Sequence, residues 1–154
     1  MTKEDALDLL KKDVARFNEL RKNDEERLDL RGVSLRECNL KGADLRRIDF
    51  SGASFQRANL SEALFTGDFL QGTDFSDADL TGADFHHSRM QGANMRGAKI
   101  SYDYPRGRLC VHANSFEKVG WDREFLEQVL AVLNQNRDWT IEYKIIPKSA
   151  VPLQ

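Results

Sequence analysis

Residues 73–85 read TDFSDADLTGADF, and within them a large apolar residue returns at every fifth position, at Phe75, Leu80 and Phe85. We call this residue position i of a five-residue unit, or pentad. The same spacing holds for fifteen consecutive pentads across residues 30–100. Their i residues are Leu30, Leu35, Leu40, Leu45, Phe50, Phe55, Leu60, Phe65, Leu70, Phe75, Leu80, Phe85, Met90, Met95 and Ile100. Position i−2 is usually small, with alanine at residues 43, 53, 58, 63, 78, 83, 93 and 98.

A period of five residues fits neither an α-helix, with a period of 3.6, nor a continuous strand, with a period of 2. It fits a short extended segment followed by a corner. In the extended segment, positions i−2 and i point to one side and position i−1 points to the other. Position i+2 is glycine at residues 32, 42, 52, 67, 72, 82, 92 and 97, as a turn favours. The pattern predicts a solenoid whose bore is filled by the i and i−2 side chains.

The exceptions at position i−2 indicate how many corners close one coil. Leu28, Ile48, Asp68 and Ser88 all replace alanine, and they lie twenty residues apart. This spacing predicts four pentads per coil. The matching column of i residues is Leu30, Phe50, Leu70 and Met90.

Residues 42–45, 57–60, 77–80, 82–85 and 92–95 carry the pattern A(D/N)L or its close variants. Over residues 26–100 the chain therefore resembles the pentapeptide repeat family, whose motif is A(D/N)LXX. The resemblance implies a mainly β fold, a right-handed quadrilateral β-helix, which agrees with the four-sided coil. Just under four coils, at a spacing of ~4.8 Å, would make a rod of roughly 18 Å.

We expect three parts: an N-terminal capping α-helix in residues 1–25, the solenoid in 26–101 and an α+β extension in 102–154. A solenoid exposes its core at both ends and needs caps. Thr2 and Asp5 form a predicted capping box at the start of a helix over residues 3–22. Its apolar stripe is Leu7, Leu10, Val14, Phe17 and Leu20. We expect this stripe to cover the first coil rather than to bind a membrane or a partner.

The C-terminal extension reads as strand, helix, strand. The strands are expected at residues 109–112 and 139–145, and Asp122 could cap the helix between them. The apolar face of this helix is Phe125, Leu126, Val129, Leu130 and Leu133. The extension closes the far end of the solenoid, carries a homodimer contact or holds a partner site, and the sequence leaves these alternatives open.

The overall composition excludes several classes of protein. The net charge of the 154 residues is −2, so no basic field attracts nucleic acid, and we expect no direct nucleic-acid binding. The charged N-terminus lacks the apolar stretch of a signal peptide, and no segment is long enough to span a bilayer. We therefore expect a cytoplasmic protein. Cys38 falls in an inward slot of the repeat, far from Cys110, which favours a buried free thiol over a disulfide.

No combination of residues indicates catalysis. His86 and His87 occupy one predicted corner, and His112 near Cys110 does not complete a set of metal ligands. The aspartates and asparagines at position i−1 have the spacing of a surface ladder rather than of a catalytic carboxylate pair. We predict that the protein is not an enzyme and has no catalytic residues, cofactor or metal.

The surface pattern is more informative. Between Arg57 and Arg89 there is no Lys or Arg, whereas the first coil is basic. Leu64 and Phe69 are apolar at outward i−1 positions, so either the register is distorted there or they form an apolar spot covered by the C-terminal segment or by a partner. The candidate partner surface comprises Leu64, Phe69, Glu62, Asp74, Asp77, Asp79 and Asp84.

These observations favour a non-enzymatic protein–protein interaction or scaffold module that presents the faces of a rigid solenoid to a partner that the sequence does not identify. The resemblance implies an alternative, because some family members imitate duplex DNA and protect type II topoisomerases from quinolones. The chain departs from them in having few coils, acidic residues confined to the middle and a basic first coil. A third hypothesis is an enzyme or metal site in the extension around Cys110 and His112.

Overall fold

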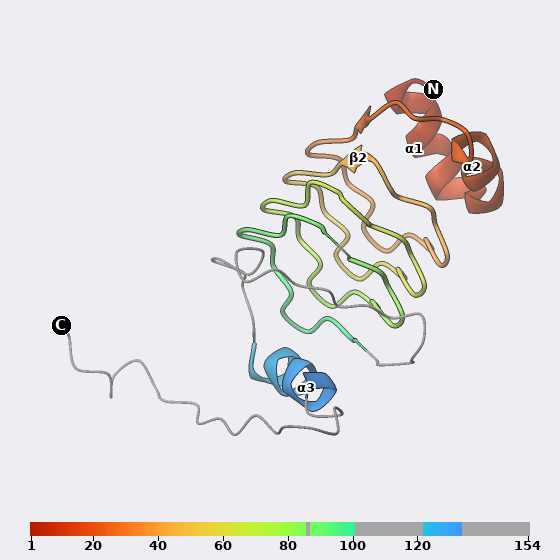
Figure 1. Ribbon diagram of the computed structural model, residues 1–154. Helices are drawn as coiled ribbons and strands as arrows, with labels where there is room; N and C mark the ends of the chain where they lie inside the picture. Colours follow the sequence, from red (N-terminus) through yellow and green to blue (C-terminus); the bar gives the residue numbers. More distant parts are fainter. Residues whose placement is uncertain (86, 101–121, 134–154) are drawn as a thin grey trace.

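The computed structural model describes residues 1–85, 87–100 and 122–133. Figure 1 shows a coiled body with helices α1 (Lys3–Lys12) and α2 (Val14–Arg21) at one end and α3 (Arg123–Leu133) at the other. The short strands β1 (Leu28–Asp29) and β2 (Ile48–Asp49) lie side by side in parallel. The expected strands at 109–112 and 139–145, and the residues His86, Cys110 and His112, lie outside the described residues.

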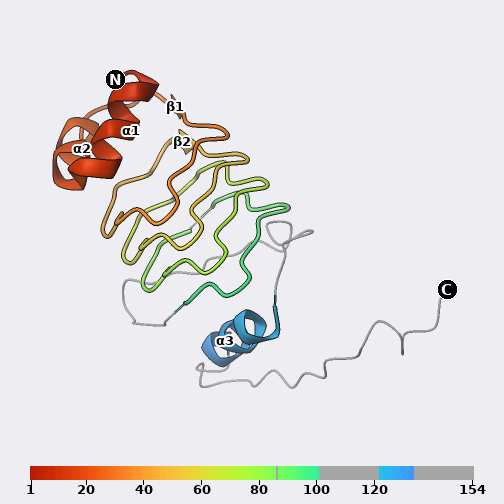
Figure 2. The ribbon, with the colours of Figure 1, turned by 180° about the vertical axis from the view of Figure 1, so that it is seen from behind.

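The coils stack with a register of twenty residues, so four pentads make one coil, as predicted. β1 and β2 pair Leu28 with Ile48, and every isolated parallel bridge also joins residues twenty apart. The bridged residues are the outward i−1 positions, and they define four faces of the body. Face A carries residues 29, 49, 69 and 89, face B 34, 54, 74 and 94, face C 39, 59, 79 and 99, and face D 44, 64 and 84. Figure 2 shows the same stacked coils from behind.

The predicted bore is present and closed. The i side chains from residue 30 to residue 95 are buried, and Ile100 packs against them partly buried. Phenylalanine rings form two stacks along the axis: the Phe55 and Phe75 centroids lie 5.3 Å apart and those of Phe65 and Phe85 lie 4.9 Å apart. The neighbouring rings of the two stacks meet edge to face, as for Phe65 and Phe75. The large side chains therefore form one continuous hydrophobic core.

The corners have a left-handed backbone at every i+2 position from 32 to 97. Glycine meets this requirement without strain, for example at Gly52 with φ +69°. Six corners, however, have a residue with a side chain at the same position and the same φ sign: Glu37, Arg47, Arg57, Glu62, Asp77 and His87. Glycine is thus favoured at the corners but not required, because the hydrogen bonds between coils hold the backbone.

The polar residues at position i−2 lie inside the bore and bond to the backbone of the preceding coil. The Thr73 hydroxyl donates to the Phe50 carbonyl at 2.9 Å, and the Ser88 hydroxyl donates to the Phe65 carbonyl at 2.5 Å. Asp68 is fully buried, and its Oδ1 accepts the Ile48 N–H at 3.0 Å. Its Oδ2 is buried and accepts no hydrogen bond from the residues that the structure describes. Burial raises the pKa of Asp68 to about 8, against the opposing effect of the backbone N–H groups of Ile48 and Arg47.

The prediction of a single N-terminal helix is wrong. Asp13 leaves the helical conformation, with φ −151° and ψ 81°, so the chain forms α1 and α2. The Asp13 side chain accepts the Arg16 N–H at 2.9 Å and so starts the second helix. The capping box of Thr2 and Asp5 is present, as predicted. Leu10 and Phe17 are fully buried, whereas Leu20 is 46% exposed and does not belong to the covering stripe.

Both caps bond to backbone groups of the first and the last described coils. At the N-terminal end, Lys3 donates to the Arg31 carbonyl at 3.1 Å, and the Asn18 side chain donates to the Gly42 carbonyl at 2.9 Å and accepts the Asp44 N–H at 2.8 Å. At the C-terminal end, the Gln128 side chain of α3 accepts the Ile100 N–H at 2.9 Å. The expected helix in the extension is thus present, and it lies against the last described coil.

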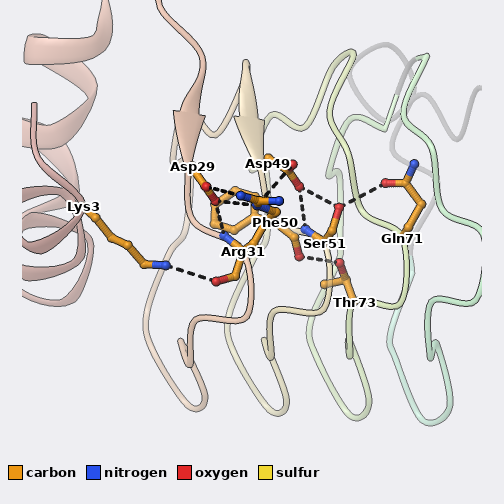
Figure 3. A network of polar contacts seen from close by, with 8 residues as sticks. All are labelled: Lys3, Asp29, Arg31, Asp49, Phe50, Ser51, Gln71 and Thr73. Atoms are coloured by element: carbon orange, nitrogen blue, oxygen red, sulfur yellow. Dashed lines mark hydrogen bonds and ion pairs between the residues drawn. The ribbon is translucent and has the colours of Figure 1, made fainter.

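Figure 3 shows how polar side chains on one side of the body link successive coils. Arg31 forms an ion pair with Asp29 at 2.6 Å and lies 3.9 Å from Asp49. The Ser51 hydroxyl donates to Asp49 at 2.6 Å and lies 3.3 Å from the Gln71 side-chain oxygen. The aspartates at position i−1 thus form the surface ladder that the sequence predicted. Among the described residues, no helix has the length and apolar character to cross a membrane.

Candidate functional site

The residues of the predicted partner surface do not form one patch. Asp74 lies on face B and Asp79 on face C, whereas Leu64 and Asp84 are bridged to each other on face D. Phe69 lies on face A, between Asp49 and Arg89. The carboxylates therefore form a belt around the body rather than a stripe along one face. These residues are close in sequence because they belong to about one coil, and the backbone of each coil passes through all four faces.

Several carboxylates of this belt make local contacts. Asp74 accepts the Ser76 N–H at 3.0 Å and the Asn94 side-chain amide at 2.9 Å. Glu62 forms an ion pair with Lys41 at 3.2 Å. Asp77 is exposed at a corner between faces B and C. Such contacts fix the side chains in place and neutralise part of the charge that a partner would meet.

The register at Leu64 and Phe69 is not distorted, because both residues bridge the coils on either side. Both side chains are half-buried. Phe69 has a cation over its ring from two other coils: the Arg27 Cζ lies 4.3 Å from the ring centroid and the Arg89 Cζ 5.1 Å from it. Cation–π contacts of this kind orient guanidinium groups on an aromatic face. The outward ring of Phe69 is thus the centre of a basic and aromatic cluster.

Arg27 and Arg89 are exposed, and neither forms an ion pair with any of the residues that the structure describes. Their guanidinium N–H groups can therefore donate to an acceptor from outside the chain. We call Arg27, Phe69 and Arg89 the face A cluster. Phe69 was among the predicted residues, but the two arginines were not. Arg89 could have been found from the twenty-residue register, which places it beside Phe69 on face A. Arg27 belongs to a corner column of the first coil, so the register gave no sign that it reaches Phe69.

The histidines and cysteines are the remaining candidates for a chemical site. His87 is exposed at its corner, as predicted, and His86 lies outside the described residues. Cys38 is a free thiol, as expected, but it is half-buried rather than buried, and burial raises its pKa. Within the described ranges no three His, Cys, Asp or Glu side chains come together to hold a metal ion. The proposed site around Cys110 and His112 lies outside the described residues.

A chain that winds in four-sided coils around a bore of regularly spaced apolar side chains is a β-solenoid repeat protein. The family model for pentapeptide repeats (8 copies) matches residues 29–67 and 69–101. The chain therefore belongs to the pentapeptide repeat proteins.

One solved structure supports this fold. A pentapeptide repeat protein, Rfr23 from the cyanobacterium Cyanothece 51142, has a TM-score of 0.55 at 23% identity, over 66% of this chain and 65% of that one. The match thus spans slightly less than two thirds of the Rfr23 chain. A trypsin-treated form of QnrB1, a plasmid-mediated fluoroquinolone resistance protein, has a TM-score of 0.35 at 21% identity, over 70% of this chain and 62% of that one. No curated protein matches the sequence significantly.

Proposed function

We propose that the protein is a non-enzymatic protein-binding module, and that face A is a surface it presents to a partner. The face A cluster carries this proposal. Arginine and aromatic side chains are enriched among the residues that dominate binding energies at protein interfaces. Here they lie on one face of a stacked β-structure, with both guanidinium groups available to an incoming acceptor. The partner should therefore present carboxylates around an apolar contact.

The solenoid offers this surface at a low entropic cost. Backbone hydrogen bonds join the successive coils along face A. The Leu30 N–H donates to the Asp49 carbonyl at 2.9 Å, and the Phe50 N–H donates to the Phe69 carbonyl at 2.9 Å. Phe69 is held by the arginine on either side of it. A surface that is already ordered loses little conformational freedom on binding. This is the physical advantage of a repeat scaffold over a loop.

Affinity capture from the native host tests the proposal, with Phe69→Asp compared against Leu64→Asp. Both changes place a carboxylate at a half-buried outward position, but Leu64 lies on face D. We expect Phe69→Asp to lose partners that wild type and Leu64→Asp retain. Each variant is first checked for folding by chemical denaturation. If a folded Phe69→Asp captures every partner that wild type captures, face A is not the binding surface.

The alternative is imitation of DNA toward a type II topoisomerase or another DNA-binding protein. A DNA mimic needs carboxylates repeated along the rod, as phosphates repeat along a duplex. With the twenty-residue register, no column of outward residues carries carboxylates in more than two successive coils. On face A, Phe69 and Arg89 follow Asp49 and end the acidic run. This arrangement argues against mimicry.

A gyrase supercoiling assay with the purified protein tests this alternative. We expect no change in supercoiling at high protein excess. Inhibition, or protection from a quinolone, would favour mimicry over the scaffold role.

The right-handed winding and the cytoplasmic location both remain predictions. The absence of a metal is also a prediction, and metal analysis of the purified protein would test it.

A further inference from the structure

A groove of about 910 Å³ lies between α1 and the end of α2. Met1, Leu9 and Leu20 supply its apolar lining. Among the described residues, Met1 and Leu20 are the exposed large hydrophobic side chains, at 42% and 46%. Both of them line this groove. The buried residues of α2 are Phe17 and Arg21, and Leu20 lies outside this buried face.

The charged side chains that line the groove are all carboxylates: Glu4, Asp5, Asp8 and Asp24. Two of them are held in place as anions. The Thr2 hydroxyl, at 2.7 Å, and the Thr2 N–H lower the pKa of Asp5. The Glu26 N–H and the buried Arg21 guanidinium lower the pKa of Asp24. Asp8 forms an ion pair with Lys12 at 2.5 Å and Asp24 one with Arg21 at 2.7 Å, so the charges of these two carboxylates are partly neutralised. The groove therefore combines exposed apolar surface with carboxylates that outnumber the cations paired with them.

We propose that this groove binds a cationic amphipathic helix of a partner protein. An amphipathic helix places its apolar side chains in such a groove and its lysines or arginines against the carboxylates along it. Helix α1 has ten residues and is about 15 Å long, which matches an incoming helix of two to three turns. An acidic or uncharged helix would leave the charges unmatched. The inference rests on the proposed protein-binding role, but it uses a surface separate from the face A cluster.

The test uses the full chain and a labelled synthetic peptide of leucine and lysine, with leucines at i, i+3, i+4 and i+7. Fluorescence anisotropy compares Leu20→Lys with Ala15→Lys. Both changes add one positive charge at an exposed position of α2, but Ala15 does not line the groove. We expect Ala15→Lys to bind as wild type does and Leu20→Lys to bind at least about tenfold more weakly.

A second variant, Glu4→Gln with Asp8→Asn, tests the contribution of charge and leaves Asp5 and Asp24 in place. We expect weaker binding and a smaller loss of affinity as salt rises, because exposed charges are screened. A peptide of the same pattern with glutamate in place of lysine should not bind. Circular dichroism and chemical denaturation confirm that each variant folds.

Three outcomes would overturn the proposal: no saturable binding to wild type, equal affinities of Leu20→Lys and Ala15→Lys, or equal binding of the glutamate peptide. Sedimentation tests whether a second copy of the chain occupies the groove. A wild-type dimer that Leu20→Lys dissociates would be a fourth outcome that overturns the proposal. Phe69→Asp should bind the peptide normally. Failure of the face A surface and failure of the groove are therefore separate results.

Discussion

The Asn18 side chain pairs with the backbone at Gly42 and Asp44 in the way that a preceding coil would. Its side-chain oxygen accepts the Asp44 N–H at 2.8 Å, and its amide nitrogen donates to the Gly42 carbonyl at 2.9 Å. Gln128 of α3 does the same at the other end, where its amide bonds to the Ile100 N–H at 2.9 Å and the Ala98 carbonyl at 3.4 Å. Each end of the repeat is thus closed by a carboxamide that pairs as a backbone peptide would. This protects an open edge from pairing with another chain.

Replacing Asn18 with alanine should lower the free energy of unfolding by about 1–3 kcal/mol, because a backbone N–H and a carbonyl lose their partners. Chemical denaturation measures the loss. Asn23→Ala is the matched control, since Asn23 is exposed and lies outside the helices, and it should change stability little. Equal stabilities of the two variants would show that the Asn18 amide does not contribute to the cap.

The buried carboxyl of Asp68 should make stability depend on pH. Its pKa in the folded protein is about 8, mainly because of burial, whereas an exposed aspartate has an ordinary pKa of 3.8. The folded state therefore holds a proton that the unfolded chain has released, so stability should fall as pH rises from about 4 to 8. Each unit of pKa shift corresponds to about 1.4 kcal/mol. Asp68→Asn should remove this slope in urea titrations at a series of pH values.

Asp79→Asn is the control for that measurement. Partial burial tends to raise the pKa of Asp79, but hydrogen bonds from the Thr81 hydroxyl and N–H outweigh it and keep the pKa below its ordinary value. Its contribution to stability is therefore lost only at acidic pH, as pH falls through the folded pKa. Asp79→Asn should keep the wild-type slope between pH 5 and 8. A wild-type protein with no slope in this range would show that Asp68 is ionised in the fold.

Phe75→Ala should be among the most damaging single changes. The Phe75 ring is fully buried, stacks on Phe55 at 5.3 Å and meets Phe65 and Phe85 edge to face. Truncation of a buried aromatic ring costs about 3–5 kcal/mol, from lost burial and from the cavity left behind. Thermal or chemical unfolding measures the loss. The exposed corner change Arg36→Gln should be nearly neutral, and similar effects of the two would contradict the filled bore.

Gly52→Ala should cost about 1–2 kcal/mol through backbone conformation alone. The φ of Gly52 is +69°, and a Cβ at this position would meet no atom within 4 Å, so a clash is not the cause. Gly52→Asn should cost less than alanine, because asparagine tolerates the left-handed region better. Chemical denaturation ranks the variants. An alanine variant as stable as wild type would show that this corner relaxes to another conformation.

The sequence predicted the repeat body well, because the period of five is a property of local geometry that every pentad repeats. The exceptions at Leu28, Ile48, Asp68 and Ser88 predicted the number of pentads per coil, and the bridges confirm it. The break at Asp13 was missed, since Leu7 to Leu20 keeps a helical spacing through it. The predicted acidic surface was grouped by closeness in the chain, whereas the coil carries Asp74, Asp79 and Asp84 to three different faces.

The pentad pattern therefore predicts the solenoid from local geometry, because its bore, its corners and its twenty-residue register follow from which side chains can share one core. Which outward residues become neighbours, by contrast, is set by the folded molecule as a whole. Arg27 reaches Phe69 across the intervening coil, and Asn18 and Gln128 find backbone groups 26 and 28 residues away. Such contacts depend on how the coils and caps stack, and a local repeat pattern does not predict them.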